Sequence, residues 1–223
     1  MYSVIKRFFD LVLSSICLLV LSPVLIPVLI GLKFTGERYI FYKQERVGFK
    51  NQHFFILKFA TMLKDSPNMA GGIFTSKKDP RFTPMGPFLR KSKINELPQL
   101  FNIWLGHMSF VGPRPVMPIS FAAYPEAVQK VIYNVKPGLT GIGSVVFRDE
   151  EQLIAKKKEN GEDAWAFYEN ELYPFKGKLE QWYQENQSFS TDFKLLVATA
   201  LVIVLPQFDV VSLFFSGVPK RNF

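Results

Sequence analysis

A carboxylate at the start of a predicted helix is the first group in this sequence that could do chemistry. Apolar residues with i, i+3, i+4, i+7, i+8 spacing predict a helix from about Asn95 to Gly106: Leu97, Leu100, Phe101, Trp104 and Leu105. Asn95 then takes the N-cap position. Pro98 falls in the first turn, where its missing N–H costs no intrahelical bond. Glu96 therefore lies where free backbone N–H groups and the helix dipole favour anions.

An arginine between two prolines follows this predicted helix. Pro113 and Pro115 restrict φ on both sides of Arg114, which would hold the guanidinium fork ready for bidentate contact with a phosphate. Glu96 and Arg114 together outline a site that handles phosphate groups. On these residues alone, an ordinary capped helix followed by a proline-rich turn is the simpler interpretation, because both features are common.

The N-terminal part of the chain contains a long apolar run. Leu11–Leu32 is 22 residues without a charge, enough to cross ~30 Å of hydrocarbon as a straight helix. Pro23 and Pro27 near its middle disfavour a straight helix. We therefore expect a re-entrant membrane helix-hairpin within residues 1–35, and a kinked spanning anchor is the alternative. Basic residues flank both ends, and the positive-inside bias would place both ends in the cytoplasm: Lys6, Arg7, Lys33, Arg38, Lys43 and Arg46.

The composition favours a protein that contacts lipid. The 223 residues are 48% hydrophobic and 15% aromatic, with 23 phenylalanines and a net charge of +8. Juxtamembrane Lys and Arg attract anionic lipids by ~1 kcal/mol each. Nucleic acid is the competing partner for such charge, and we exclude it because no helix-turn-helix, zinc-ligand or aromatic RNP pattern accompanies the basic residues. Cys17 is the single cysteine, so disulfides within the chain and cysteine-based metal sites are excluded.

The remaining pattern predicts an α+β fold that is mostly helical. Aromatic and β-branched runs at Tyr39–Tyr42 and His53–Phe59 predict a small β-hairpin. Glycines and prolines between Ser66 and Pro87 predict a loop. Residues 122–135 and 150–173 are largely polar and predict helices.

The C-terminal segment is apolar as well. From Leu195 to Val218, Asp209 is the only charge and Pro206 interrupts the run. A second spanning helix would need a longer unbroken stretch. We therefore expect an amphipathic, partly inserted tail at the membrane interface. A core helix over residues 195–205 is the alternative.

Two charged clusters flank these elements. The acidic cluster at residues 149–151 is expected to cap the following helix rather than to hold a metal, because carboxylates are favoured at helix N-termini. The basic cluster precedes Glu96, where it could neutralise a pyrophosphate or a lipid phosphate, and a solvated loop is the alternative. The basic cluster contains six basic residues, and Asp79 is the single acidic residue in the same stretch: Lys77, Lys78, Arg81, Arg90, Lys91 and Lys93.

Eight short segments form a recognisable pattern along nearly the whole chain. Two are the most specific: residues 90–100 read RKSKINELPQL, and residues 108–115 read MSFVGPRP. The pattern resembles the signature of the monotopic phosphoglycosyl transferases, a family of bacterial sugar transferases. The other six segments agree in order and approximate spacing: Lys6–Asp10, Ser22–Pro23, Gln44–Gly48, Lys58–Met62, Asp79–Arg81 and Lys136–Gly141.

The resemblance implies a reaction and its partners. Such enzymes move a phosphosugar from a UDP-sugar to polyprenol phosphate at the cytoplasmic face of the bacterial inner membrane. They require Mg²⁺, release UMP and initiate a lipid-linked glycan. The implied organisation is a re-entrant helix at 1–35, a cytosolic catalytic domain at 36–194 and an apolar interfacial tail at 195–223. Membrane lipids are implied partners, and a homodimer is left open.

The resemblance also assigns residues to the site. The family's catalytic Asp-Glu pair, in which the Asp is the nucleophile, falls on Asn95 and Glu96, and Glu96 is the expected Mg²⁺ ligand. The expected phosphate ligands are basic: Lys58, Arg81, Arg90, Lys91 and Arg114.

The sequence departs from the family pattern at its most important position. Asn95 has no ionisable oxygen and cannot act as the ordinary carboxylate nucleophile. Three explanations are open: Glu96 takes over, the chain is an inactivated variant that traps a substrate complex, or it binds substrate without catalysis. Ala60 replaces an arginine that many relatives carry, and Glu180 stands where an aspartate is common. The pattern is also looser over residues 141–148, so substrate choice is harder to transfer than reaction class.

Overall fold

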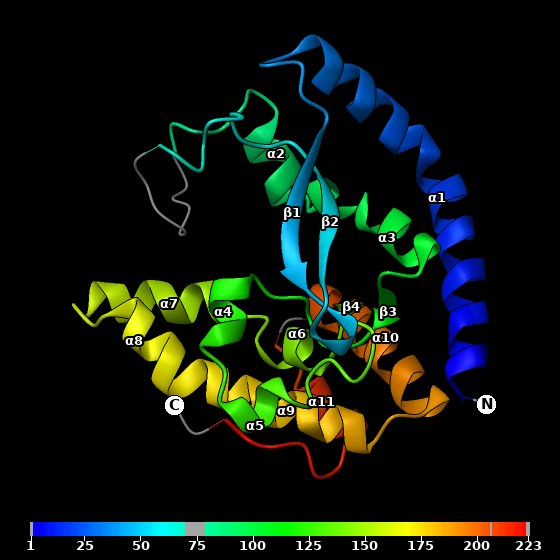
Figure 1. Ribbon diagram of the computed structural model, residues 1–223, viewed down its shortest axis with the longest axis vertical. Coiled ribbons are helices and arrows are strands. Elements are labelled where there is room, and N and C mark those ends of the chain that lie inside the picture. The colour runs from blue at the N-terminus through cyan, green and yellow to red at the C-terminus, as the bar shows by residue number, and fades with distance from the viewer. Residues whose placement is uncertain (1, 70–78, 206, 222–223) are drawn as a thin grey trace. The chain divides into compact units, whose positions relative to one another are not determined.

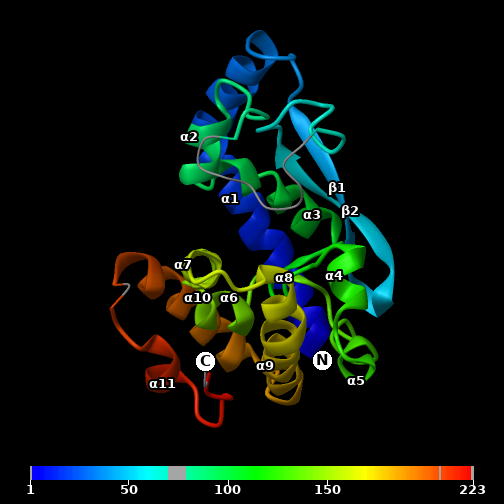
Figure 2. The same ribbon diagram turned by 90° about the vertical axis from the view of Figure 1, so that its left-hand side faces the viewer.

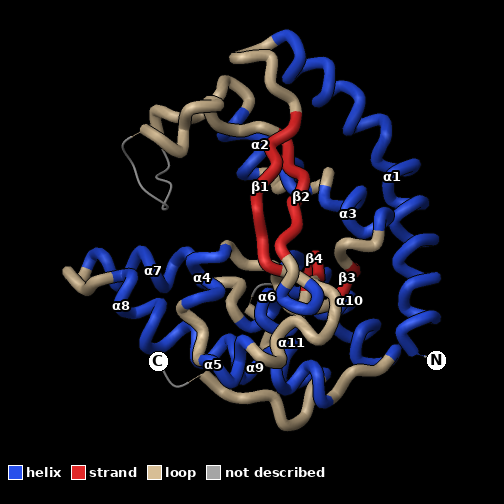
Figure 3. Tube along the Cα trace, viewed as in Figure 1, coloured by secondary structure: helices blue, strands red, loops and turns tan. Residues whose placement is uncertain are grey.

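The computed structural model describes residues 2–69, 79–205 and 207–221. Over these residues the chain is mostly helical, with two small two-stranded sheets (Figure 3), which agrees with the predicted α+β class. The chain divides into two compact units. Unit 1 comprises Met1–Asp10, Glu45–Phe54 and Gly106–Phe223, and unit 2 comprises Leu11–Gln44 and Phe55–Leu105.

The apolar N-terminal run forms one continuous helix, α1 (Tyr2–Phe34), and the re-entrant helix-hairpin stays a prediction. Among the described residues it is the one helix long and apolar enough to cross a membrane, and only 11% of its most apolar stretch is buried. Pro23 lies inside α1 and cannot donate to the Leu19 carbonyl. The Ser22 hydroxyl donates to that carbonyl instead, at 2.7 Å. The hydroxyl thus satisfies a backbone group that the proline leaves open, as is needed in an apolar surrounding.

The predicted β-hairpin is confirmed. Strands β1 (Phe41–Val47) and β2 (His53–Phe59) pair, and the short helix η1 (Phe49–Asn51) joins them (Figure 1). Lys50 and Asn51 adopt left-handed backbone angles in this connection, with φ of 56° and 57°. The first strand starts later than the aromatic run suggested and continues through charged, mostly exposed residues.

The described residues of unit 2 form three further helical elements: α2 (Gly86–Lys91), η2 (Ile94–Glu96) and α3 (Gln99–Leu105). Between the hairpin and α2, residues 66–69 and 79–85 are without helix or strand as predicted, whereas Gly71 and Gly72 lie outside the described residues. An apolar core of unit 2 joins α1 to β2 and α2: Leu25, Val28, Leu32, Phe59 and Leu89.

The helix predicted from Asn95 to Gly106 is wrong at its beginning. Asn95 lies inside the 3-10 turn η2 instead of capping a helix, and α3 begins at Gln99. Pro98 explains the difference, because it has no N–H to donate to the preceding turn. The turn before it is closed by i+3 bonds, such as Leu97 N–H to Ile94 C=O at 3.1 Å.

Unit 1 is built on a short parallel sheet. Strand β3 (Ser109–Val111) pairs with β4 (Gly138–Thr140), so the two motifs around Gly112 and Gly138 lie side by side. A Cβ on Gly138 would stand 2.1 Å from the Gly112 nitrogen, so only glycine permits this approach of the two backbones. Helices α6 (Ile142–Val146) and α10 (Phe189–Val204) contact this sheet. Helix α9 (Tyr173–Glu185) packs against α6, and α11 (Val210–Phe214) packs against α10 (Figures 1 and 2).

The unit 1 core includes Leu179 of α9 and Leu195 of α10, both fully buried. Leu195 and Ala198 show that the first half of the apolar C-terminal segment is part of a core helix, whereas Ile203 and Val204 are exposed.

The helix predicted over residues 122–135 is wrong. Two short helices, α4 (Pro118–Ala122) and α5 (Glu126–Gln129), are separated at Pro125, and Tyr133 lies in irregular chain. Over 150–173 the structure is helical as predicted, with a break after Asn160 where Gly161 takes a left-handed φ of 77°. The helical pieces are α7 (Glu150–Glu159), α8 (Ala164–Phe167) and the π-helical turn η3 (Tyr168–Leu172).

The first turns of α1 are fixed within unit 1 by polar contacts. Asp10 is buried and accepts hydrogen bonds from the Ser109 hydroxyl and the Phe110 N–H, both at 3.0 Å. Lys6 forms an ion pair with Asp192 of α10, and Tyr183 of α9 donates to the same carboxylate at 2.8 Å. The start of the apolar helix is therefore tied to β3 and to two core helices.

Candidate functional site

Two residues that the sequence analysis singled out separately meet in unit 2. The Lys58 ammonium on β2 lies 2.9 Å from Oε1 of Glu96 in η2. Their side chains are 15% and 23% exposed, so the pair is largely shielded while still reachable. Partial burial strengthens the attraction between the two charges compared with a surface pair.

Asn95, next to this pair, has an unusual environment. The residue is 8% exposed, and its Oδ1 is buried without a hydrogen-bond partner. Buried polar atoms are nearly always bonded, so an unsatisfied oxygen calls for an explanation. Lys93, which begins this turn, adopts a left-handed backbone with φ of 59°. An unsatisfied oxygen beside a carboxylate is a suitable receptor for a cation or a donor group.

A residue that sequence reasoning missed holds the two halves of this site together. Asn102 of α3 is 1% exposed. Its amide nitrogen donates to the Phe55 carbonyl at 2.8 Å, and its Oδ1 accepts from the Leu57 N–H at 2.9 Å. The side chain thereby pairs with β2 as a neighbouring strand would. The available signal was an asparagine between buried Leu100 and Ile103 on an otherwise apolar helix face.

The other basic residues of unit 2 differ in burial and in the groups that they contact. Arg81 is buried, and its guanidinium donates to Asp79 at 2.9 and 2.7 Å. Arg90 lies over the ring of Phe82, 5.3 Å from its centroid. Lys91 is exposed at the end of α2, and Lys77 and Lys78 lie outside the described residues. The phosphate-binding assignments of Arg81, Arg90 and Lys91 stay predictions.

Arg114 belongs to unit 1, where its loop is rigidly supported. The arginine is exposed, whereas Pro113 and Pro115 on either side are buried. The buried Tyr133 hydroxyl donates to the Arg114 carbonyl at 2.9 Å and accepts from the Val116 N–H at 3.1 Å. Burial raises the pKa of Tyr133, so the hydroxyl stays protonated as this donor. A stiff backbone under Arg114 suits phosphate binding, and the role itself stays a prediction.

Unit 1 also contains a buried carboxyl group, that of Glu180. The Gly143 N–H donates to it, and its Oε2 is buried without a partner. Burial raises its pKa to about 8, against the opposing effects of Lys176 and of the Gly143 bond. Glu180 therefore carries a proton at neutral pH.

Two acidic residues at the start of α7 form ion pairs. Asp149 stands at the N-cap, but its carboxylate receives two 2.8 Å bonds from Arg221 and makes no cap bond. The capping prediction was therefore wrong for this side chain. Glu150 accepts from Lys176 at 2.7 Å and from the Tyr168 hydroxyl at 2.8 Å. Within the described part of the chain, no group of three or more His, Cys, Asp or Glu residues is placed to hold a metal.

Asn102→Leu should loosen the site. The leucine fills similar space but leaves the Phe55 carbonyl and the Leu57 N–H without partners, at a cost of about 1–3 kcal/mol for each buried group. We expect a lower melting temperature in detergent and faster hydrogen exchange of the Leu57 amide. Gln99→Leu removes another buried amide of α3 and is the matched control. Unchanged exchange at Leu57 would show that the two bonds do not hold β2.

Glu180→Gln should remove part of the pH dependence of stability. The folded pKa of about 8 lies above the unfolded value of 4.5, so the folded state holds an extra proton between these values. The free energy of unfolding consequently falls as pH rises through this window. The glutamine side chain does not titrate, so the free energy of unfolding of this variant does not fall in the same way. Relative to the parent chain, it should rise toward about pH 9 by ~1.4 kcal/mol for each unit of pKa difference.

Thermal unfolding of the parent chain and of Glu180→Gln between about pH 5 and pH 9 measures this difference in stability. This pH range covers the window in which the folded and unfolded states differ in the protonation of Glu180. Glu185→Gln on the exposed side of α9 is the control and should stay parallel to the parent chain. A constant difference between the parent and Glu180→Gln across the range would mean that the pKa of Glu180 is not raised.

Comparisons with known proteins agree with the motif pattern. The family model described as bacterial sugar transferase matches residues 1–206. The chain is 38% identical over 157 residues to an undecaprenyl-phosphate glucose phosphotransferase of Komagataeibacter xylinus, covering 65% of this chain and 30% of that protein. It is 30% identical over 214 residues to an undecaprenyl-phosphate galactose phosphotransferase of Salmonella typhimurium, covering 90% of this chain and 40% of that protein.

A third relative is of more similar length. The exopolysaccharide production protein ExoY of Sinorhizobium fredii is 36% identical over 159 residues, which cover 65% of this chain and 70% of that protein. The matched region thus spans less than half of the first two relatives and more than two thirds of the third. With the family model covering nearly all of its length, the chain belongs to the bacterial sugar transferase family.

Proposed function

We propose that this chain transfers a phosphosugar from a UDP-sugar to a polyprenyl phosphate and releases UMP, initiating a lipid-linked glycan. The observation that carries the proposal is the shielded Lys58–Glu96 pair beside the unsatisfied Asn95 oxygen, in a member of a sugar transferase family. Two relatives are named for phosphotransfer to undecaprenyl phosphate, which supports this class of acceptor.

The proposed chemistry places the attacking carboxylate at Glu96. One of its oxygens forms a bond to the phosphorus that carries the sugar, and the bridging bond of the diphosphate breaks, so UMP leaves with that electron pair. A phosphate oxygen of the polyprenyl phosphate then attacks the same phosphorus and releases Glu96. The product is a polyprenyl diphosphate sugar.

Lys58 has two roles in this scheme. Its ammonium holds Oε1 of Glu96 and so fixes the position of the carboxylate. It also places positive charge close to the phosphorus, where negative charge develops during transfer. Arg114, with its supported backbone, is the proposed bidentate contact for a substrate phosphate.

Mg²⁺ is part of this proposal. The ion is commonly bound by one or two protein oxygens, with waters and substrate phosphates completing its shell. Glu96 and the unpartnered Oδ1 of Asn95 provide two oxygen donors on adjacent residues, so they fit an ion of this kind. When bound, it would neutralise diphosphate charge.

Asn95→Asp and Glu96→Gln distinguish which residue is the nucleophile. If Glu96 attacks, the parent chain releases UMP with undecaprenyl phosphate and one of a panel of UDP-sugars. Glu96→Gln then loses more than the ~10²–10⁴-fold that acid–base help typically supplies. Mass spectrometry should find a phosphosugar adduct on residue 96.

If Asn95 instead disables an ancestral mechanism, Asn95→Asp should create or greatly raise UMP release, with the adduct on residue 95. The melting temperature of each variant controls for folding. A chain that binds the UDP-sugar but stays inactive as Asn95→Asp would support the alternative function, a catalytically silent membrane scaffold. Binding of neither substrate would defeat both functions.

We further propose that α1 enters and leaves the cytoplasmic leaflet of the inner membrane instead of crossing the bilayer. Its two internal prolines, the hydroxyl of Ser22 on an open carbonyl and the basic residues at both ends support a bent, re-entrant path.

Single cysteines test this topology. In a Cys17→Ser background, Ser3→Cys and Thr35→Cys flank the apolar run. An impermeant maleimide added to intact spheroplasts should label neither residue, and both should react after lysis. Labelling of one residue from the periplasmic side, with the other protected until lysis, would establish a spanning helix.

A further inference from the structure

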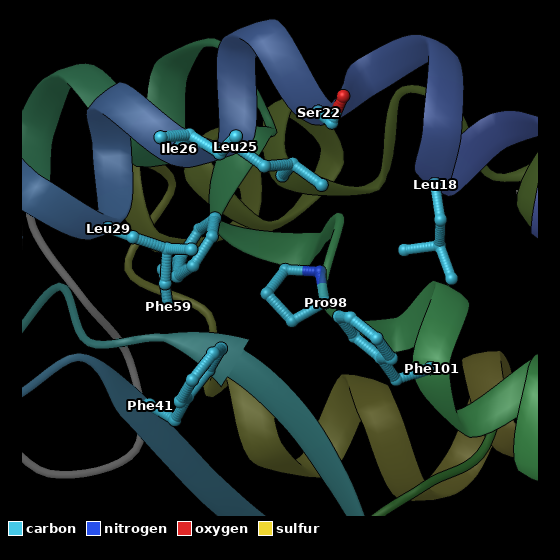
Figure 4. A pocket seen from close by; sticks show the side chains of 9 residues that line it. All are labelled: Leu18, Ser22, Leu25, Ile26, Leu29, Phe41, Phe59, Pro98 and Phe101. Atoms are coloured by element: carbon cyan, nitrogen blue, oxygen red, sulfur yellow. The ribbon is translucent and has the colours of Figure 1, made fainter.

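Unit 2 contains an apolar cavity of about 190 Å³ whose walls come from four segments of its sequence (Figure 4). Helix α1 contributes aliphatic side chains, including Leu18 and Leu29. Strands β1 and β2 contribute Phe41 and Phe59, whose rings stack with centroids 5.7 Å apart. Phe101 of α3 and the nearby Pro98 close another side.

The walls of this cavity suit a hydrocarbon. Ser22 is its one polar lining residue, and the hydroxyl of Ser22 already donates to the Leu19 carbonyl. An enclosed apolar cavity of about 150 Å³ takes a guest the size of benzene, so the volume here is large enough for a small hydrocarbon group. One methyl-branched five-carbon unit is of that size.

The cavity lies close to the ion pair of the candidate site. Phe59 directly follows Lys58, and Pro98 is the second residue after Glu96. Since consecutive Cα atoms are ~3.8 Å apart, both wall residues have their Cα within about 8 Å of a charged partner's Cα. The cavity and the ion pair therefore share two short segments of unit 2, although Phe59 and Lys58, as neighbours on a strand, point to opposite faces of β2. A lipid with its hydrocarbon chain in the cavity reaches the Lys58 ammonium when its anionic end passes around this strand.

We infer that this cavity receives the first isoprene unit next to the phosphate of the lipid acceptor. The inference rests on the proposed function, because that function supplies an isoprenoid with an anionic head. Wall residues of α1 recur at positions 18, 22, 25 and 29, which follow one face of the helix. The rest of the isoprenoid chain runs along this face into the bilayer.

Photocrosslinking tests the cavity without any need for turnover, so the asparagine at position 95 does not interfere. The probe is a polyprenyl phosphate with a diazirine on its first isoprene unit, added to the full chain in nanodiscs and mapped by peptide mass spectrometry. Adducts are expected within Leu18–Leu29 and Pro98–Phe101. Unlabelled undecaprenyl phosphate should compete, whereas phosphatidylglycerol at the same concentration should not. Adducts elsewhere, or equal competition by the phospholipid, would overturn the inference.

Matched tryptophan variants sharpen the test. Leu18→Trp fills the cavity, and Leu19→Trp places the same ring on the neighbouring position, which is 75% exposed. Leu18→Trp should lower crosslinking and raise KM for the polyprenyl phosphate at least about tenfold with KM for the UDP-sugar unchanged, an effect in the range for one hydrophobic group. Leu19→Trp should leave both unchanged, and equal effects of the two variants would contradict a cavity site.

Two further outcomes separate this inference from the proposed function. Phe101→Ala opens a wall and should also reduce labelling, which keeps the test decisive if Leu18→Trp folds poorly. UMP release with adducts outside the cavity would overturn the inference and leave the function standing. Adducts in the cavity without UMP release from either the parent chain or Asn95→Asp would reject the function and leave an isoprenoid-binding cavity.

Discussion

The arrangement of unit 2 depends on how the chain satisfies the backbone of β2. In a two-stranded sheet each strand has an open edge with unpaired N–H and C=O groups. Asn102 supplies one donor and one acceptor to the Phe55 carbonyl and the Leu57 N–H, and it does so from a buried position on α3. The same two bonds therefore satisfy the strand edge and fix the segment that carries Glu96 against the strand that carries Lys58. A leucine at position 102 would pack as well and would position neither.

In unit 1, glycine allows two backbone segments to approach each other closely. The parallel pairing of β3 with β4 brings two backbones so close that a Cβ on Gly112 would lie 2.3 Å from the Lys136 carbonyl oxygen. This approach brings the Pro-Arg-Pro motif beside the Lys-Pro-Gly motif, although twenty residues lie between them in the sequence. The Tyr133 hydroxyl then donates a hydrogen bond to the carbonyl of Arg114. The arginine consequently projects from a loop in which rigid neighbours and a buried hydroxyl limit backbone motion.

Both units keep polar atoms buried at a cost to stability. The Asn95 oxygen and the Glu180 Oε2 are buried without partners, and each such atom costs on the order of 1–3 kcal/mol. Such atoms are usually eliminated unless a ligand or a proton uses them. At Glu180 a proton reduces the cost, as its raised pKa shows. At Asn95 the amide cannot respond in that way, which is consistent with a position shaped for a ligand or for a different side chain.

The sequence by itself determined the features that depend on local composition or on a recognisable pattern. Hydrophobic length predicted α1, the aromatic and β-branched runs predicted the β-hairpin, and the motif segments identified the family and pointed to Glu96. These succeed because the responsible interactions involve neighbouring residues. Tertiary structure decided what depends on distant partners. It paired Lys58 with Glu96, placed Asn102 at a strand edge and paired Asp149 with Arg221 instead of with a helix end. It also placed the Tyr133 hydroxyl against the Arg114 carbonyl. Side-chain hydrogen bonds between residues far apart in the chain leave no periodic signal in the sequence, so only the folded chain reveals them.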